Sequence, residues 1–173
     1  MEDVLDRLCA TVPDYPKPGI TFKDLTPVFA DPEGFRTIVD AIIAPFLGRF
    51  DLVAGIEARG FLLAAAAAYA AGTGVLTVRK AGKLPRTTFT EEYALEYGTA
   101  ALEVHTTDIP QGARVLVLDD VLATGGTVGA AVRLVNRSGG TVVGVGVVLE
   151  LDGLGGRAAL AGQEIHSLQC VGG

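Results

Sequence analysis

Residues 115–127, VLVLDDVLATGGT, decide the fold of this 173-residue chain. The stretch opens with four consecutive apolar residues, which is typical of a strand buried on both faces of a parallel sheet. Asp119 and Asp120 follow where that strand is expected to end, and a turn of small residues comes next. Apolar residues at positions 128, 131, 132 and 135 then predict a helix, which Ser138 and two glycines end. Strand, acidic pair, glycine turn and helix together indicate one ligand site.

The glycine turn predicts a phosphate site. Glycines let the backbone approach an anion closely, and the start of a helix adds unpaired N–H groups and the positive end of its dipole. Asp119 and Asp120 disfavour a second phosphate, but carboxylates accept hydrogen bonds from a vicinal diol. The combination indicates a ribose 5-phosphate. The Walker lysine and the G-x-G-x-x-G dinucleotide spacing are both missing here. The alternative is an ordinary strand-to-helix turn with an acidic cap.

This stretch resembles the phosphoribosyl-pyrophosphate binding motif of the type I phosphoribosyltransferases, including two acids and a T-G-G-T turn. Further stretches resemble the members of that family that use adenine, and together they cover nearly the whole chain. The resemblance implies a transferase that joins adenine to 5-phosphoribosyl 1-pyrophosphate and releases AMP and pyrophosphate. It implies that the ribose phosphate is bound by Asp119, Asp120, Ala123, Thr124, Gly125, Gly126 and Thr127.

The whole chain is expected to form one domain, because 173 residues can bury a sizeable core. A hydrophobic content of 49% with 23 glycines and 6% aromatics favours an α/β fold packed with small aliphatic side chains. We expect a mostly parallel, doubly wound sheet with helices on both faces. We also expect a small N-terminal hood over about residues 1–30 and a flexible lid loop over about residues 80–97.

The overall charge excludes some partners. A net charge of -6 leaves no global basic field, so neither nucleic acid nor an anionic membrane is an expected partner. The N-terminus is acidic, unlike a signal peptide, and no apolar run is long enough for a membrane span. The apolar run at residues 61–71 predicts a buried helix. Cys9 and Cys170 lie far apart and are expected to be free, buried thiols in a reducing cytoplasm.

Residues 15–27, YPKPGITFKDLTP, contain prolines and a glycine that predict an extended, turning segment. From the residues alone, this is an ordered surface loop. The resemblance implies an adenine-binding hood, where backbone groups of Thr21 contact the edge of the base and the Phe22 ring packs on its face. Lys23 stands where many family members carry arginine, so it keeps the charge without the planar fork.

Residues 51–57, DLVAGIE, predict another buried strand. Glu57, Ala58 and Arg59 then lie at the carboxyl end of a strand, where open α/β sheets bind ligands. From the residues alone, an arginine at a strand end is more often part of a surface ion pair. The resemblance implies a pyrophosphate loop here, with a cis peptide bond between Glu57 and Ala58.

Residues 75–79 predict a strand, and positive charge is then concentrated within eight residues, at Arg79, Lys80, Lys83 and Arg86. Residues 80–97 show no sustained period of either kind, which suits a mobile lid. The RKAGKLP segment resembles the family, and the resemblance makes Arg79 and Lys83 candidates for binding the leaving pyrophosphate. From the residues alone, such a basic run is usually a solvated loop.

Glu96 and Tyr97, in a family-like LEYG segment, are the candidate catalytic pair. A carboxylate delivered by the lid can accept the proton that adenine loses at N9, or bind N7. Mg²⁺ is expected on the substrate diphosphate, because that ion prefers phosphate oxygens and water to an all-protein cage. The resemblance also implies a homodimer. The two histidines, His105 and His166, are expected to be structural.

The remaining elements follow from local patterns. A helix is predicted at the N-terminus, and another after an Asp31 cap, with Pro32 as its first residue. Strands are predicted at residues 99–105, 141–150 and 164–169, with a short helix or turn before the last. Two other functions stay open: a transferase for another base, such as xanthine, and a non-catalytic sensor of phosphoribosyl pyrophosphate.

Overall fold

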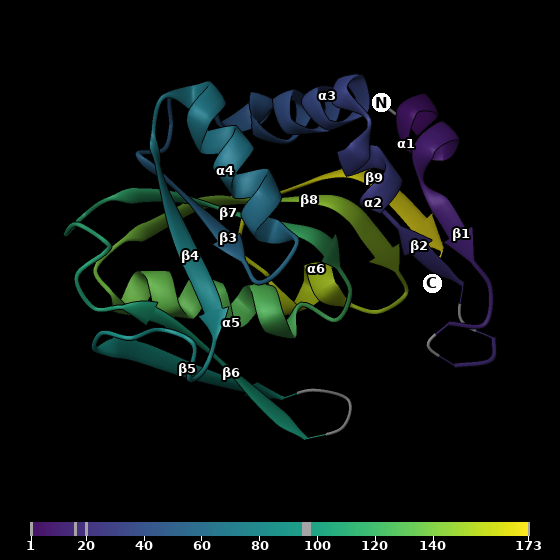
Figure 1. Cartoon of the computed structure of the whole chain (residues 1–173). Helices are drawn as coiled ribbons and strands as arrows, with labels where there is room; N and C mark the ends of the chain where they lie inside the picture. The colour runs from purple at the N-terminus through teal and green to yellow at the C-terminus, as the bar shows by residue number, and fades with distance from the viewer. Residues whose placement is uncertain (1, 16, 20, 95–97, 173) are drawn as a thin grey trace.

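A seven-stranded sheet forms the centre of the protein (Figure 1). The computed structural model describes residues 2–15, 17–19, 21–94 and 98–172. The strand order is β5-β6-β4-β3-β7-β8-β9. Neighbouring strands from β4 to β9 are parallel, while β6 pairs antiparallel with β4 and β5. The predicted mostly parallel sheet is therefore confirmed. Its strands are β3 (Leu52–Ile56), β4 (Gly74–Lys80), β5 (Thr88–Ala94), β6 (Thr99–His105), β7 (Arg114–Leu122), β8 (Thr141–Asp152) and β9 (Ile165–Gly172).

Helices cover both faces of this sheet, as predicted (Figure 1). One face packs against α3 (Pro32–Ile43) and α4 (Gly60–Ala71), and the other against α5 (Gly126–Arg137). The short helices are α1 (Glu2–Leu8), α2 (Thr26–Ala30), the 3-10 turn η1 (Ala44–Phe46) and α6 (Gly156–Ala159).

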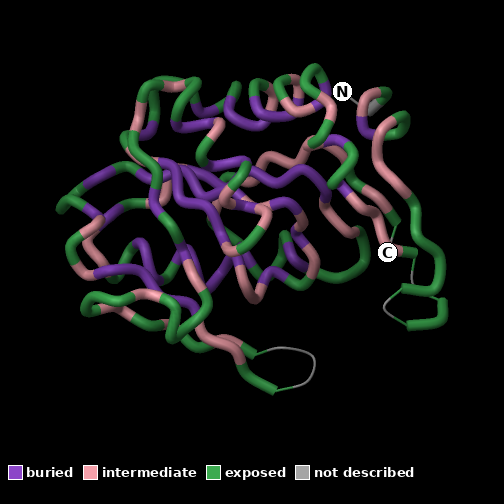
Figure 2. Tube along the Cα trace, in the orientation of Figure 1, coloured by how far each residue is buried: buried purple, intermediate pink, exposed green. Residues whose placement is uncertain are grey.

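The central strand β7 is buried on both faces, because its side chains alternate between two cores. Val115 and Val117 belong to the cluster beside α5, whereas Leu116 and Leu118 belong to the cluster beside α3 and α4. Figure 2 shows the buried path through the central strands, with exposed segments around the rim. The prediction from the apolar run at residues 115–118 is confirmed.

β7 nevertheless extends past the acidic pair that was expected to end it. Asp119, Val121 and Leu122 still pair with residues of β8, which is a long strand of 12 residues. A long neighbour supplies hydrogen-bonding partners that a local pattern cannot reveal. The acids are therefore held within the rigid end of a strand rather than in a loop.

The helix start predicted from the Asp31 cap agrees with the structure. The Asp31 side chain accepts a hydrogen bond from the N–H of Gly34 at 2.7 Å, and Pro32 is the first residue of α3. The side-chain cap and the fixed backbone angle of proline both favour a helix start at this point.

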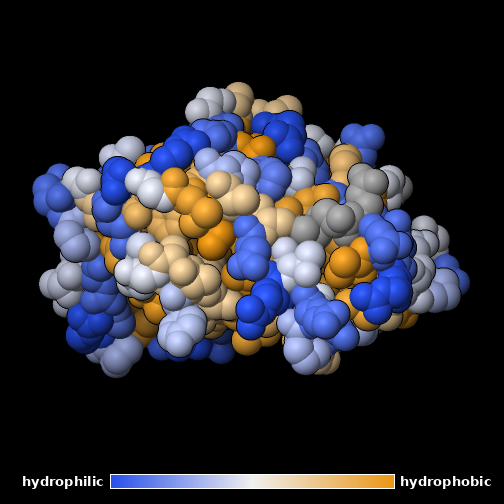
Figure 3. Space-filling view, turned by 90° about the horizontal axis from the view of Figure 1, so that it is seen from above, coloured by the Kyte–Doolittle hydropathy of each residue, from blue (hydrophilic) through white to orange (hydrophobic). Residues whose placement is uncertain are grey.

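The prediction that residues 61–71 form a buried helix is only half right. The helix α4 exists, but it lies at the surface, with Leu62 52% exposed and Tyr69 91% exposed. Only one face, including Leu63 and Ala67, packs against the sheet. Seen from above, apolar side chains gather over this part of the molecule (Figure 3).

The N-terminal segment forms a separate two-stranded antiparallel sheet of β1 (Ala10–Val12) and β2 (Phe22–Asp24). Its register pairs Ala10 with Asp24 and Val12 with Phe22. Because the hydrogen-bonded ladder is short and stands apart from the main sheet, this segment is positioned mainly by side-chain contacts. Cys9 precedes it and is half-buried, while Cys170 is exposed, so both thiols are free but neither is buried as expected.

Residues 80–97 were expected to lack regular structure, and for residues 88–94 this is wrong. Strand β5 pairs with β6 along its whole length. Glu91 also binds α5, with one carboxylate oxygen 2.6 Å from Nε of Arg133 and the other 3.2 Å from Nη1 of Arg137. Pairing across the hairpin and these ion pairs override the weak local pattern. No described helix is long and apolar enough to cross a membrane.

Candidate functional site

The turn between β7 and α5 forms a small anion-sized pocket. Gly125 has φ +84°, and a Cβ at this position would lie 2.8 Å from the carbonyl oxygen of Gly156, so only glycine fits without displacing backbone. No described side chain caps the first N–H groups of α5. The pocket has a volume of about 80 Å³, and its lining is Asp119 together with residues 121–128. Open N–H groups at a helix start suit a phosphate.

The acidic pair lies beside this turn in two different environments. Asp119 lines the phosphate-sized pocket, while Asp120 is 7% exposed and lies opposite Arg59. Nε of Arg59 is 2.6 Å from Oδ2 of Asp120, yet that buried oxygen receives no aligned hydrogen bond from any described residue. Arg59 balances the charge of this oxygen, and its lone pairs have no aligned donor among the described residues.

The two carboxyl groups are held together by the backbone. The N–H of Asp120 donates to Oδ1 of Asp119 at 2.9 Å. Although Asp119 keeps some contact with solvent, the protein atoms around its carboxyl group desolvate it. This burial, with the nearby charge of Asp120, raises the pKa of Asp119 well above its usual range. The pair is therefore suited to exchange hydrogen bonds with hydroxyl groups of a ligand, and not to bind a second anion there.

The loop after β3 brings the second predicted group of residues close to the acids. The peptide bond between Glu57 and Ala58 is cis, which confirms the expectation. Arg59 directly precedes α4, and a Cβ on Gly60 would lie 2.8 Å from the carbonyl oxygen of Leu118 and 3.2 Å from Oδ1 of Asp119. The loop and the end of β7 are in direct contact.

Glu57 gathers the predicted cations. Its carboxylate is 3.3 Å from Nε of Arg79 and 3.8 Å from Nζ of Lys83, and it accepts the N–H of Lys80 at 3.0 Å. Burial alone would raise the pKa of Glu57, but the Lys80 N–H and the charges of Arg79 and Lys83 outweigh burial and lower it. The structure thus brings Glu57, Arg79 and Lys83 together as one charged group.

The hood segment contacts the same loop through one aromatic ring. The guanidinium carbon of Arg59 lies 5.8 Å from the centre of the Phe22 ring, and Tyr15 packs edge-on against that ring at 5.3 Å. Thr21 directly precedes β2. The Lys23 ammonium donates to Oγ1 of Thr11 across the β1–β2 pair at 3.0 Å, which occupies a side chain that was predicted for the base site.

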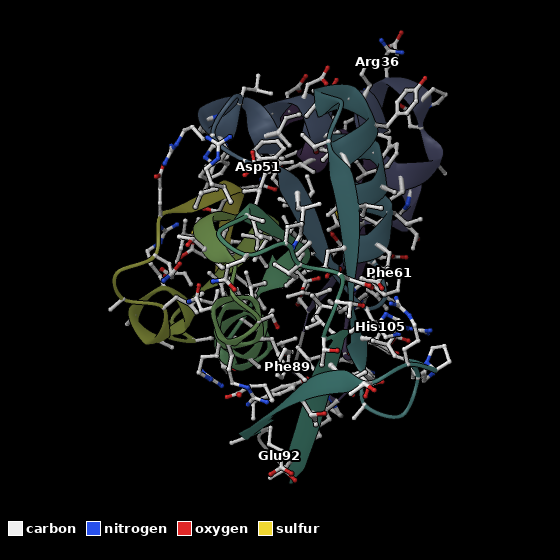
Figure 4. The ribbon with its side chains drawn as sticks, turned by 90° about the vertical axis from the view of Figure 1, so that its left-hand side faces the viewer. Arg36, Asp51, Phe61, Phe89, Glu92 and His105 are labelled. Atoms are coloured by element: carbon white, nitrogen blue, oxygen red, sulfur yellow. The ribbon has the colours of Figure 1, made fainter. Side chains whose placement is uncertain are left out.

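The end of β5 lies against the phosphate turn. A Cβ on Gly126 would lie 3.3 Å from the carbonyl oxygen of Ala94 and 3.5 Å from the Tyr93 ring. A groove of about 480 Å³ runs between this strand end and the start of α5. In Figure 4, Phe89 points towards α5 and Glu92 points outward from the same strand. The predicted catalytic residues Glu96 and Tyr97 lie outside the described residues.

Two acids of the site were missed from the sequence. Asp24 accepts hydrogen bonds from the backbone and side chain of Thr26, which lower its pKa, and the charge of Arg59 lowers it further. Glu103 is 5% exposed and accepts the N–H groups of Lys83 and Leu84. The only signal for Glu103 was a charge within an otherwise apolar stretch of strand. The two histidines stay outside the site: His105 contacts Asp108, and His166 packs on Phe46.

Comparisons with known proteins agree on one family. The phosphoribosyl transferase domain matches residues 35–161. An adenine phosphoribosyltransferase of Renibacterium salmoninarum is 68% identical over 168 residues, covering 97% of this chain and 92% of that protein. The crystal structure of adenine phosphoribosyltransferase from Rhodothermus marinus is similar, with a TM-score of 0.92 and 47% identity over 98% of this chain and 97% of that chain.

A third similar structure contains ligands. It is the adenine phosphoribosyltransferase of Saccharomyces cerevisiae complexed with an imino-altritol bisphosphate and adenine, at 34% identity and a TM-score of 0.91. The likeness covers 98% of this chain and 100% of that chain.

Proposed function

The chain belongs to the phosphoribosyltransferase family, and from this premise we propose that it transfers the 5-phosphoribosyl group of 5-phosphoribosyl 1-pyrophosphate to adenine. The products are AMP and pyrophosphate, so the reaction salvages a purine base. The single observation that carries the proposal is the phosphate-sized pocket, which Asp119 and the glycine turn line together. The close relatives are adenine phosphoribosyltransferases, and they favour neither a sensor nor a transferase for another base.

In the proposed complex the 5-phosphate occupies the pocket at residues 123–127. The backbone N–H groups of the turn and the start of α5 bind it. Asp119 and Asp120 accept hydrogen bonds from the two ribose hydroxyl groups. The buried oxygen of Asp120, which has no aligned donor among the described residues, supports this role.

The leaving diphosphate is proposed to face residues 57–59 and the cations Arg79 and Lys83. In the structure these cations are balanced by Glu57, and a diphosphate offers more negative charge in the same place. The side chains proposed to face the diphosphate are mainly cations, so Mg²⁺ would be held through the diphosphate oxygens and water, which this ion prefers to an all-protein cage. When bound, the ion neutralises part of the charge on the leaving group.

The chemistry follows from charge separation. Glycosyl transfer passes through an oxocarbenium-like transition state, so positive charge grows on the ribose while negative charge grows on the diphosphate. The acids at the end of β7 stabilise the first, and Arg59, Arg79 and Lys83 stabilise the second. Glu96, with Tyr97, is proposed to receive the proton from adenine N9 or to bind N7. The segment at about residues 80–97 is proposed to lie over the site as a lid and to exclude water, which would hydrolyse the sugar.

The base is proposed to bind under the hood, about residues 1–30 of a single domain, against Phe22 and the backbone of Thr21. The ring of Phe22 near Arg59 supplies a face on which a base can stack. A backbone N–H donates to N1 of adenine and a backbone C=O accepts from its 6-amino group. Hypoxanthine reverses both, and two mispaired groups at about 1–3 kcal/mol each predict discrimination on the order of 10².

Product formation from the activated sugar with adenine, hypoxanthine, guanine, xanthine and orotate in parallel tests this function. Adenine should be used on the order of 10² better than hypoxanthine. Thr21→Val should leave that preference unchanged, because the contacts belong to the backbone. Equal use of hypoxanthine or xanthine would exclude the hood assignment but leave the phosphoribosyl site standing. A protein that makes no nucleotide from any base would reject the enzyme proposal.

We further propose that the active form is a homodimer in the cytoplasm. A helix that is apolar on all sides is normally buried, and α4 exposes Leu62 and Tyr69. A second copy of the chain is the proposed cover for this face. The free thiols of Cys9 and Cys170 suit a reducing compartment.

A further inference from the structure

One buried acid, Glu103, binds the backbone of the basic loop between β4 and β5, residues 81–87. Glu103 is 5% exposed, and its Oε1 accepts the backbone N–H groups of both Lys83 and Leu84 at 2.9 Å. Its other oxygen lies 3.5 Å from Oγ1 of Thr88. Hydrogen bonds to a carboxylate are stronger than those between neutral groups, so two of them on one oxygen form a firm anchor.

Glu103 lies on β6, a strand that is paired on both sides. β6 pairs with β4 on one side and β5 on the other, where Glu103 lies opposite Arg79 and Thr90. Burial would raise the pKa of Glu103, but the N–H groups of Leu84, Gly82 and Lys83 outweigh burial and lower it. The group is therefore a carboxylate at neutral pH, although no described cation pairs with it.

Both backbone polar groups of Lys83, its N–H and its C=O, are hydrogen-bonded. Glu103 accepts its N–H, and Nη1 of Arg79 donates to its carbonyl oxygen at 3.3 Å. From this fixed backbone the Lys83 side chain, 53% exposed, places its ammonium 3.8 Å from Oε1 of Glu57. The ordering of the backbone is thus complete before a ligand arrives, which lowers the entropy lost on binding.

We propose that Glu103 is a positioning residue for the leaving diphosphate, acting through the backbone of Lys83. This inference rests on the proposed function, because it presupposes that Lys83 binds the leaving diphosphate. Glu103 touches neither reacting atoms nor base. Its effect should therefore appear in the use of the activated sugar and not in the use of adenine.

Two conservative variants separate this role from a simple need for charge. Glu103→Gln keeps the length and one carbonyl oxygen, so it can still accept both N–H groups. Glu103→Asp keeps the charge but is one methylene too short to reach them. Positioning predicts that Glu103→Asp raises KM for the activated sugar about tenfold and that Glu103→Gln raises it by less, while both variants keep KM for adenine within about twofold of the unchanged protein. A role for buried charge predicts the opposite order.

A double-mutant cycle checks that the effect passes through Lys83. In a Lys83→Ala background, Glu103→Asp should change KM for the sugar less than about twofold. Independent, multiplicative effects would overturn the proposal, as would a Glu103→Asp enzyme with an unchanged sugar KM or with both KM values raised alike. If the unchanged protein forms no nucleotide, the proposed function fails instead.

Hydrogen exchange reads the anchor without any turnover. The amides of Lys83 and Leu84 should exchange slowly in the unchanged protein and about tenfold faster or more in Glu103→Asp, while amides of β7 keep their rates. If the variant does not fold, the unchanged protein still decides, because fast exchange of these two amides would show that the anchor does not hold the loop.

Discussion

Replacing Gly60 by alanine tests how closely the loop before α4 must approach β7. The added Cβ would lie 2.8 Å from the carbonyl oxygen of Leu118 and 3.2 Å from Oδ1 of Asp119. Carbon and oxygen atoms normally keep a longer distance, so the two elements must separate by roughly half an ångström. Overpacking of this kind costs about 1–3 kcal/mol of folding free energy, and each kcal/mol lowers Tm by about 2–4 °C at this chain length.

The same displacement should impair catalysis. A misplacement of about 1 Å can cost on the order of 10² in rate, so half of it should lower kcat/KM for the activated sugar about tenfold. Gly72→Ala is the matched control: it lies at the other end of α4, has φ +67°, and its Cβ would meet no atom within 4 Å. That change costs about 1–2 kcal/mol through backbone strain alone. Thermal unfolding and steady-state kinetics are measured on both. If Gly60→Ala keeps its Tm and kinetics, or Gly72→Ala loses as much kcat/KM, the close approach does not set the site.

Two further substitutions address the acidic pair and the hood. Burial and the charge of Asp120 raise the pKa of Asp119, so the folded protein binds this proton more tightly than the unfolded chain, and the group lowers stability as the pH rises above the usual value of 3.8. Asp119→Asn should therefore have a higher Tm than the unchanged protein at pH 7, lose that advantage below about pH 4, and still form AMP poorly because one diol acceptor is weakened. Thermal scans across pH and product assays decide this, and a Tm at pH 7 no higher than that of the unchanged protein contradicts it. Phe22→Ala should raise KM for every purine by a similar factor of about ten, through loss of a stacking face, and should affect the sugar less. A selective loss of adenine over hypoxanthine would show instead that the ring determines base choice.

The parts of the fold predicted from the sequence are those with local causes. The apolar run before Asp119, the glycine turn at residues 124–127 and the Asp31 cap each carry their own physical reason within a few residues. The resemblance to the family pointed to Glu57, Arg79 and Lys83, and the structure brings these three side chains together.

The parts that were missed depend on distant partners. Strand β5 forms through pairing with β6 and through ion pairs of Glu91 with two arginines of α5 that lie more than forty residues later. Glu103 accepts a hydrogen bond from the N–H of Lys83, twenty residues earlier in the chain. The Lys23 ammonium donates to Thr11, which lies on a strand that was not predicted. How much of α4 is exposed depends on which other elements pack against it, and the composition of the helix does not predict those elements.

The separation of the β1–β2 sheet from the main sheet has a consequence for how the family can diversify. No hydrogen-bonded ladder joins the two sheets among the described residues. A substitution that shifts one hood strand against the other therefore leaves the register of β3 and β7 unchanged, together with the loops that follow them. On the proposed assignment, new base preferences can arise in a short segment whose failures cost little core packing. The phosphoribosyl site need not change with them, and the contact between Phe22 and Arg59 is one place where the two parts must stay compatible.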